Sequence, residues 1–138
     1  MANRSIYITD NDMRRLRELI IVAREFGKED EIYLQKLENE LDKGKVVKSQ
    51  EVPSNVITMN SEVYLRDLNT KEKITYRLVF PYLADADKGW VSILAPIGTA
   101  LLGYSVGDIV EWKVPAGAAK LKVEKILYQP EAVGDYHS

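Results

Sequence analysis

The period of the apolar residues changes once along this 138-residue chain, near Gly44. Before Gly44, apolar residues recur at steps of three and four, which is typical of amphipathic helices. After it, the apolar runs are short and rich in β-branched and aromatic residues, and Pro53 excludes a helix interior. The change predicts an α+β fold in two parts, a helical region over residues 1–48 and a sheet domain over residues 49–138.

The helical region is predicted to form a short antiparallel hairpin. Residues 6–8 fit a short strand, and good N-cap residues follow it before a helix that begins near Asp12. Gly27 fits the end of this helix, and a second helix is expected from about Asp30 to Lys43. The apolar seams of the two helices match, so the short connection predicts packing as in a coiled coil. The seams are Met13, Leu16, Ile20 and Ala23, then Leu34, Leu37 and Leu41; the N-cap candidates are Thr9, Asp10 and Asn11.

The sheet domain is predicted to be mainly antiparallel, with one short helix. Several runs have the composition of strands, and turn residues separate them. Pro96 suits the first turn of a helix, Gly103 suits its end, and the residues between are mostly apolar. The predicted strands cover residues 56–59, 63–65, 74–80, 90–94, 109–114 and 121–127.

The chain contains no cysteine and a single histidine, His137. These counts exclude disulfides, thiol nucleophiles and cysteine-based zinc sites, and they remove most histidine-dependent chemistry. We therefore expect no catalytic residues, no metal site and no cofactor. No window approaches the ~20 consecutive apolar residues of a membrane span, and the N-terminus lacks a signal-peptide pattern, so a cytoplasmic protein is expected.

The charge balance favours a protein partner or a small ligand. Nineteen Lys and Arg against 21 Asp and Glu give a net charge of −2. This balance argues against a broadly basic surface, so no direct sequence-specific binding of nucleic acid is expected.

Three short segments resemble the C-terminal domain signature of the Gre transcript-cleavage factors. They are residues 95–103 (APIGTALLG), 106–108 (VGD) and 115–117 (PAG). Two others, residues 56–61 (VITMNS) and 128–136 (YQPEAVGDY), resemble in particular the branch of that family called regulator of nucleoside diphosphate kinase, or Rnk. The resemblance covers roughly residues 50–136, whereas the first 48 residues match in layout only. It implies an FKBP-like fold for the sheet domain.

The resemblance also implies a partner. In the Gre family, an N-terminal coiled coil enters the secondary channel of RNA polymerase, and acidic residues at its tip help to hold a catalytic metal. Here the first helix has about 15 residues and spans on the order of 23 Å. A domain docked at the channel entrance would leave so short a tip far from the metal. We therefore expect binding, and competition with Gre-type factors, without stimulated cleavage; the alternative is a shortened factor that retains weak stimulation.

Ala95, Pro96 and Ile97 form the first candidate site. By resemblance, they lie in the loop-to-helix segment that contacts the polymerase at the channel entrance. The alternative is purely structural, because a proline at a helix start and an apolar residue facing the core need no partner. Many cleavage factors have serine where this chain has Ala95, so no serine contact carries over.

The acidic tip of the helical hairpin is the second candidate site. Its acids could approach a metal or a basic channel wall, but acids in the first helical turn are also favoured by the helix dipole. The tip residues are Lys28, Glu29, Asp30 and Glu31. The arginines of the first helix leave a similar choice between a basic strip for an acidic partner and a solvated face. They are Arg14, Arg15, Arg17 and Arg24.

Two other functions remain open from the sequence. Trp90 and Trp112 could line a proline-binding pocket, because FKBP-like isomerases use aromatic pockets, although such residues in strands are usually core. The helical hairpin could instead serve as a docking pair for nucleoside diphosphate kinase. The effect on that kinase from which the Rnk branch takes its name could also be indirect, through transcription.

Overall fold

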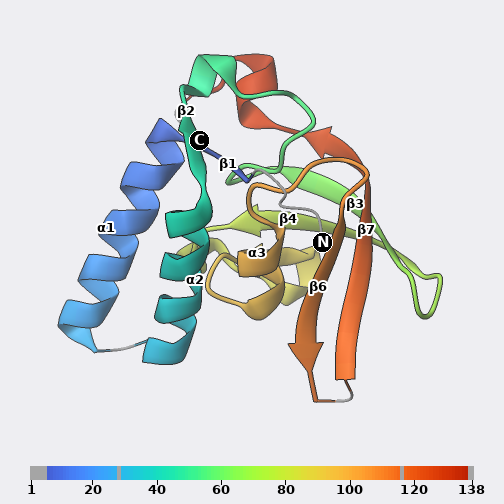
Figure 1. Ribbon diagram of the computed structural model, residues 1–138, viewed down its shortest axis with the longest axis horizontal. Helices are drawn as coiled ribbons and strands as arrows, with labels where there is room; N and C mark the ends of the chain where they lie inside the picture. The colour runs from blue at the N-terminus through green and yellow to red at the C-terminus, as the bar shows by residue number, and fades with distance from the viewer. Residues whose placement is uncertain (1–5, 28, 116, 137–138) are drawn as a thin grey trace.

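The computed structural model describes residues 6–27, 29–115 and 117–136 (Figure 1). Two helices pack side by side in the N-terminal part, and a short parallel pair of strands closes their base. Thr9 caps the first helix, because its hydroxyl oxygen accepts a hydrogen bond from the Asp12 N–H at 3.0 Å. Gly27 ends that helix in the left-handed conformation, with φ 63°. The elements are β1 (Tyr7–Thr9), α1 (Asp10–Phe26), α2 (Glu31–Lys43) and β2 (Lys45–Val47).

The C-terminal part is a five-stranded sheet in the order β5-β4-β3-β7-β6, covered on one face by a short helix, α3 (Pro96–Leu101). Neighbouring strands are antiparallel, except that β4 and β5 are parallel. Short 3-10 helices join the remaining segments. The strands are β3 (Glu62–Asp67), β4 (Lys73–Val79), β5 (Trp90–Ser92), β6 (Ile109–Val114) and β7 (Gly117–Tyr128); the 3-10 helices are η1 (Ser49–Glu51), η2 (Pro81–Leu83), η3 (Ala86–Lys88) and η4 (Pro130–Val133).

This arrangement confirms a mixed α+β fold with a helical N-terminal region, and it corrects three expectations. The first helix begins at Asp10 rather than near Asp12. Residues 56–59 form no strand, apart from one isolated bridge from Val56 to Ser105. β5 runs parallel to β4, because η2 and η3 return the chain to the same end of the sheet before β5 begins.

One cluster of buried apolar residues joins the two parts. The helices contribute their inner seams, and the sheet contributes the face covered by α3. In Figure 1, α2 lies between α1 and α3, and it contacts both. The buried seam residues are Leu16, Ile20, Ala23, Leu34, Leu37 and Leu41, and their sheet-domain partners include Ile57, Met59, Val63, Leu65, Leu78 and Val123. The helical hairpin is therefore held against the sheet domain by shared core packing.

Candidate functional site

The segment before α3 is held in a rigid turn. The Ala95 N–H donates to the Ser92 carbonyl oxygen at 3.0 Å, and the Thr99 hydroxyl donates to the Ile93 carbonyl oxygen at 2.6 Å. Gly98 allows the close approach, because a Cβ there would lie 2.0 Å from the Ser92 carbonyl oxygen. Several local hydrogen bonds and one glycine thus fix the position of Pro96.

The three candidate residues of this segment differ in exposure. Pro96 occupies the first turn of α3 and is exposed. Ile97 is half-buried and packs against the core, and Ala95 is half-buried. Of the three residues, Pro96 is therefore the one most open to a partner, and Ile97 has the structural role that the sequence also allowed.

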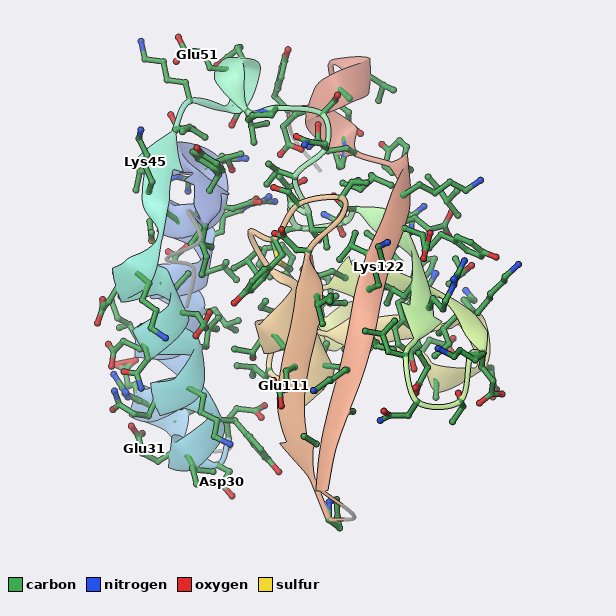
Figure 2. The ribbon with its side chains drawn as sticks, turned by 45° about the vertical axis from the view of Figure 1, so that its right-hand side comes forward. Asp30, Glu31, Lys45, Glu51, Glu111 and Lys122 are labelled. Carbon is green, nitrogen blue, oxygen red and sulfur yellow. The ribbon has the colours of Figure 1, made fainter. Side chains whose placement is uncertain are left out.

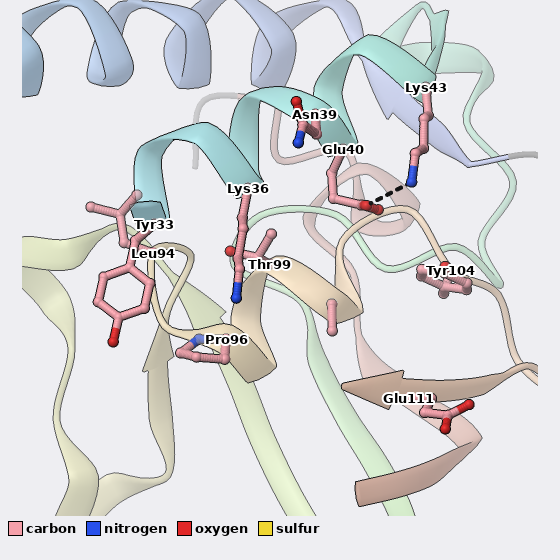
Figure 3. Close-up of a pocket in the computed structure, with 11 residues that line it drawn as sticks. Tyr33, Lys36, Asn39, Glu40, Lys43, Leu94, Pro96, Thr99, Tyr104 and Glu111 are labelled. Carbon is pink, nitrogen blue, oxygen red and sulfur yellow. Dashed lines mark hydrogen bonds and ion pairs between the residues drawn. The ribbon is translucent and has the colours of Figure 1, made fainter. Parts of the chain in front are cut away.

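A cleft of about 280 Å³ separates Pro96 from the helical hairpin (Figure 3). Figure 3 shows Lys36 extending from α2 toward Pro96. Lys43 and Glu40 form an ion pair at 3.3 Å on the same side of α2. The lining residues are Tyr33, Lys36, Asn39, Glu40, Lys43, Leu94, Pro96, Thr99, Ala100, Tyr104 and Glu111.

The α2 side of this cleft was not among the predicted site residues. Its members at positions 33, 36, 40 and 43 recur at steps of three and four, which places them on one face of the helix. That spacing was a signal in the sequence, but the core seam of leucines one position away has the same period. The cleft face and the core face of α2 can be told apart only from the position of α3 opposite Lys36.

The acidic tip lies at the end of the helical hairpin away from β1 and β2, where Figure 2 labels Asp30 and Glu31. Asp30 is the N-cap of α2 and accepts a hydrogen bond from the Ile32 N–H at 3.0 Å. Glu31 pairs with Arg24 at 2.8 Å, and Glu29 is exposed. Lys28 lies outside the described residues. Two of the tip acids are thus already engaged in holding the helices.

The arginines of α1 are all engaged by side chains of their own chain. Arg24 binds both Glu31 and Glu38, and these hydrogen bonds raise the pKa of the Arg24 guanidinium, Glu38 having the larger effect. The same contact lowers the pKa of Glu38. The remaining partners are Asn11 for Arg14, Asp12 for Arg15 and Asp42 for Arg17. The pattern favours a self-paired face over a free basic strip.

A polar joint connects the base of the helical hairpin to the sheet domain. The buried carboxylate of Asp12 accepts a hydrogen bond from the Met59 N–H at 3.0 Å and pairs with Arg15 at 2.7 Å. Thr58 donates to the Glu131 carboxylate at 2.7 Å. Burial raises the pKa of the Asp12 carboxyl and that of the Glu131 carboxyl above their ordinary values.

The joint is built from the two segments whose sequences resemble the Rnk branch, residues 56–61 and 128–136. Gln129 donates to the carbonyl oxygens of Pro53 and Val56, at 2.8 and 2.7 Å. At the far end, Asn11 of α1 donates to the carbonyl oxygen of Tyr136 at 3.1 Å. These two segments therefore hold the hairpin base and the sheet domain together.

Within the described residues, no group of three or more His, Cys, Asp or Glu side chains could hold a metal ion. Nor does any described helix combine the length and the apolar composition needed to cross a membrane.

A helical hairpin joined to a five-stranded sheet, with a proline-started helix facing it, is an arrangement shared with the GreA/GreB family of transcription factors. Residues 52–128 match the family model "Transcription elongation factor, GreA/GreB, C-term", and residues 4–47 match "Rnk N-terminus". The chain belongs to the regulator-of-nucleoside-diphosphate-kinase (Rnk) branch of the GreA/GreB family, as the sequence resemblance predicted.

Individual relatives agree with this assignment. The regulator of nucleoside diphosphate kinase of Escherichia coli K12 is 37% identical over 137 residues, which is 99% of this chain and 98% of that protein. The transcription elongation factor GreA of Orientia tsutsugamushi (strain Boryong) is 33% identical over 124 residues, 79% of this chain and 78% of that protein. The structure of a GreA/GreB factor from Nitrosomonas europaea matches with a TM-score of 0.73 and 34% identity, over 90% of this chain and 100% of that chain. These relatives are named as regulators or transcription factors, not as enzymes.

Proposed function

We propose that this chain is a cytoplasmic transcription regulator that binds RNA polymerase at the entrance of its secondary channel, through the segment of Ala95, Pro96 and Ile97. It competes there with Gre-type factors and does not stimulate transcript cleavage. The observation that carries the proposal is the exposure of Pro96 on a turn that four neighbouring residues hold rigid. A preorganised apolar surface loses little conformational freedom on binding.

The length of the helical hairpin supports binding without cleavage. α1 has 17 residues and α2 has 13. At 1.5 Å per residue, the longer helix spans only about 26 Å. In addition, Asp30 and Glu31 at the tip of the hairpin are engaged by an N-cap hydrogen bond and by Arg24, and these contacts compete with the binding of a hard cation.

The FKBP-like classification of the sheet domain, and the division of the chain at residues 48 and 49, remain part of this proposal. The structure does not support prolyl isomerase activity. The Trp90 ring is covered by the cations of Arg77 and Lys88, and Trp90 does not line the cleft beside Pro96. The structure does not describe the side chain of Trp112. Direct binding of nucleoside diphosphate kinase rests on the name of the relatives alone, and binding to the purified kinase tests it.

The test is competition between this chain and a cleavage-competent Gre factor for core RNA polymerase, with cleavage of backtracked RNA scored in the same samples. We expect displacement of the Gre factor and no cleavage by this chain alone. Pro96→Ala should weaken competition, whereas Pro81→Ala, which changes a proline at the start of η2, should not. Cleavage would show that the tip reaches the metal, and a lack of displacement would overturn the proposal.

A further inference from the structure

The face of the sheet that points away from α3 carries aromatic and basic side chains in three rows. Val63 and Leu65 of β3 are buried in the core, so the alternate residues of this strand and their register partners lie on the opposite face. Figure 2 labels Lys122 on β7, in the last of these rows. The rows are Trp90, Arg77, Glu62 and Tyr128; then Thr75, Tyr64 and Lys125; then Lys73, Arg66 and Lys122.

The first row contains a stack of rings and cations. The Arg77 guanidinium lies 5.5 Å from the centre of the Trp90 ring and 5.1 Å from that of the Tyr128 ring. Lys88 places its Nζ 4.8 Å from the same Trp90 ring. In the described part of the chain, the buried Nε of Arg77 has no hydrogen-bond partner. In the second row, Lys125 lies over Tyr64 at 5.4 Å.

These rings are held in place but are not covered. Trp90, Tyr128 and Tyr64 are half-buried, and Lys88 and Lys125 are exposed. Cation–π contacts of this kind stabilise a sheet by themselves, and that is the simplest explanation of each pair. It does not explain why rings and cations lie together in the first two rows while the third row is entirely basic.

Positive charge is concentrated on this face of the sheet. The chain as a whole has a net charge of −2. On and beside the face, basic side chains outnumber the acidic ones, Glu62, Glu124 and Asp135. Glu124 is paired with Arg66 at 3.3 Å, and Asp135 accepts a hydrogen bond from the Tyr128 hydroxyl at 3.5 Å. The basic residues are Arg66, Lys73, Arg77, Lys88, Lys122 and Lys125. The local excess of positive charge favours the binding of an anionic partner.

We propose that this sheet face binds single-stranded nucleic acid without sequence preference, with phosphates against the Lys and Arg side chains and bases stacked on Trp90, Tyr128 and Tyr64. An electropositive surface with interleaved rings is the arrangement by which proteins hold single strands, because every base offers a flat ring to stack on. The face is formed by other residues than Pro96 and its cleft, so this activity does not depend on polymerase binding.

The test is fluorescence anisotropy of a labelled 12-nucleotide oligouridylate titrated with the full chain at low ionic strength. We expect binding that weakens with salt, with a log–log slope of about −0.7 for each phosphate contacted. The double variant Lys88→Gln/Lys125→Gln should weaken binding by about fivefold or more, because it removes two phosphate contacts. The matched control Lys36→Gln/Lys43→Gln removes the same charge from α2 and should leave the affinity unchanged.

A second pair of variants separates stacking from charge. Trp90→Ala should weaken binding by about fivefold or more, and Trp90→Phe should retain most of it, because the ring and not the indole N–H is required. Circular dichroism is used to check that both variants are folded. Equal binding of a duplex of the same length, or of poly-glutamate, would show that charge alone is recognised and would overturn the proposal. Loss of binding in the α2 control, or no binding at low salt, would also overturn it.

Discussion

The carboxylate of Asp12, in the first turn of α1, accepts a hydrogen bond from the backbone N–H of Met59, 47 positions further along the chain, at 3.0 Å. Asp12 is fully buried, and Arg15 supplies its counter-charge at 2.7 Å. A buried N–H and a buried carboxylate would each be costly without a partner. This contact therefore helps to fix the base of the helical hairpin on the sheet domain, together with the shared core.

Asp12→Ala should lower the free energy of unfolding by about 1–3 kcal/mol, because it leaves the buried Met59 N–H without an acceptor. Asp12→Asn should cost less, since its amide oxygen can still accept that bond. Urea denaturation measures both. Asp42→Ala is the surface control, because the exposed Asp42–Arg17 pair should contribute no more than about 1 kcal/mol. Equal losses for all three variants would show that Asp12 has no special role.

The joint should also make stability depend on pH. Burial raises the pKa values of Asp12 and Glu131 above 3.8 and 4.5, so the folded state binds protons that the unfolded state has released. Their contribution to stability is therefore largest at low pH and is lost as the pH rises through the raised pKa values. Glu131→Gln should reduce the loss of unfolding free energy with rising pH, measured by urea denaturation at a series of pH values from 4.5 upward. Glu29→Gln, at the exposed tip, should not change it. If the unfolding free energies of wild type and Glu131→Gln changed with pH in parallel, Glu131 would not be a source of the pH dependence.

Gly98→Ala should disturb the turn that presents Pro96. The new Cβ would lie 2.0 Å from the Ser92 carbonyl oxygen, and backbone cannot yield as a side chain can. We expect a loss of about 1–3 kcal/mol in unfolding free energy and weaker competition for polymerase. The comparison is Gly107→Ala, whose Cβ would have nothing within 4 Å, so that only its positive φ of 97° should lower stability and competition for polymerase should be unchanged. A Gly98→Ala protein as stable and as competitive as wild type would disprove the rigid-turn argument.

Arg24→Gln should reduce the melting temperature at low salt, because it removes both ion pairs that join α1 to α2 near the tip. The difference from wild type should shrink at 1 M salt, since exposed charges are screened. Differential scanning fluorimetry at two salt concentrations measures it. Lys36→Gln provides the comparison, because it removes a charge from α2 that forms no ion pair among the described residues. A salt-independent loss in Arg24→Gln would point to packing instead.

The helices and most strands were predictable because their signals are local. Leu34, Leu37 and Leu41 repeat at the helical period, and all three are buried. Residues 56–59 misled the prediction because their β-branched composition is that of a strand. Their backbone N–H groups are satisfied by distant or side-chain acceptors, such as the Tyr104 carbonyl for Ile57 and the Ser61 hydroxyl for Thr58. No local pattern encodes such partners.

The candidate site was predictable in part for the same reason. Pro96 at the start of a helix is a local signal, and its turn is where the sequence indicated. The cleft beside it requires Lys36 of α2 to face α3, which depends on how the helical hairpin packs against the sheet. β2 was not predicted either, since Lys45–Val47 becomes a strand only when the returning hairpin brings it beside β1.

The parallel pair of β1 and β2 has a consequence for how this family can change over evolution. Both ends of the helical hairpin are held at one place, by this pair and by Asp12, while Asp30 and Glu31 lie at the opposite end of the hairpin (Figure 2). Insertions of seven residues in each helix would keep the seam in register and lengthen the arm by about 10 Å without altering its anchor. The reach of the arm and the docking of its base can therefore evolve independently.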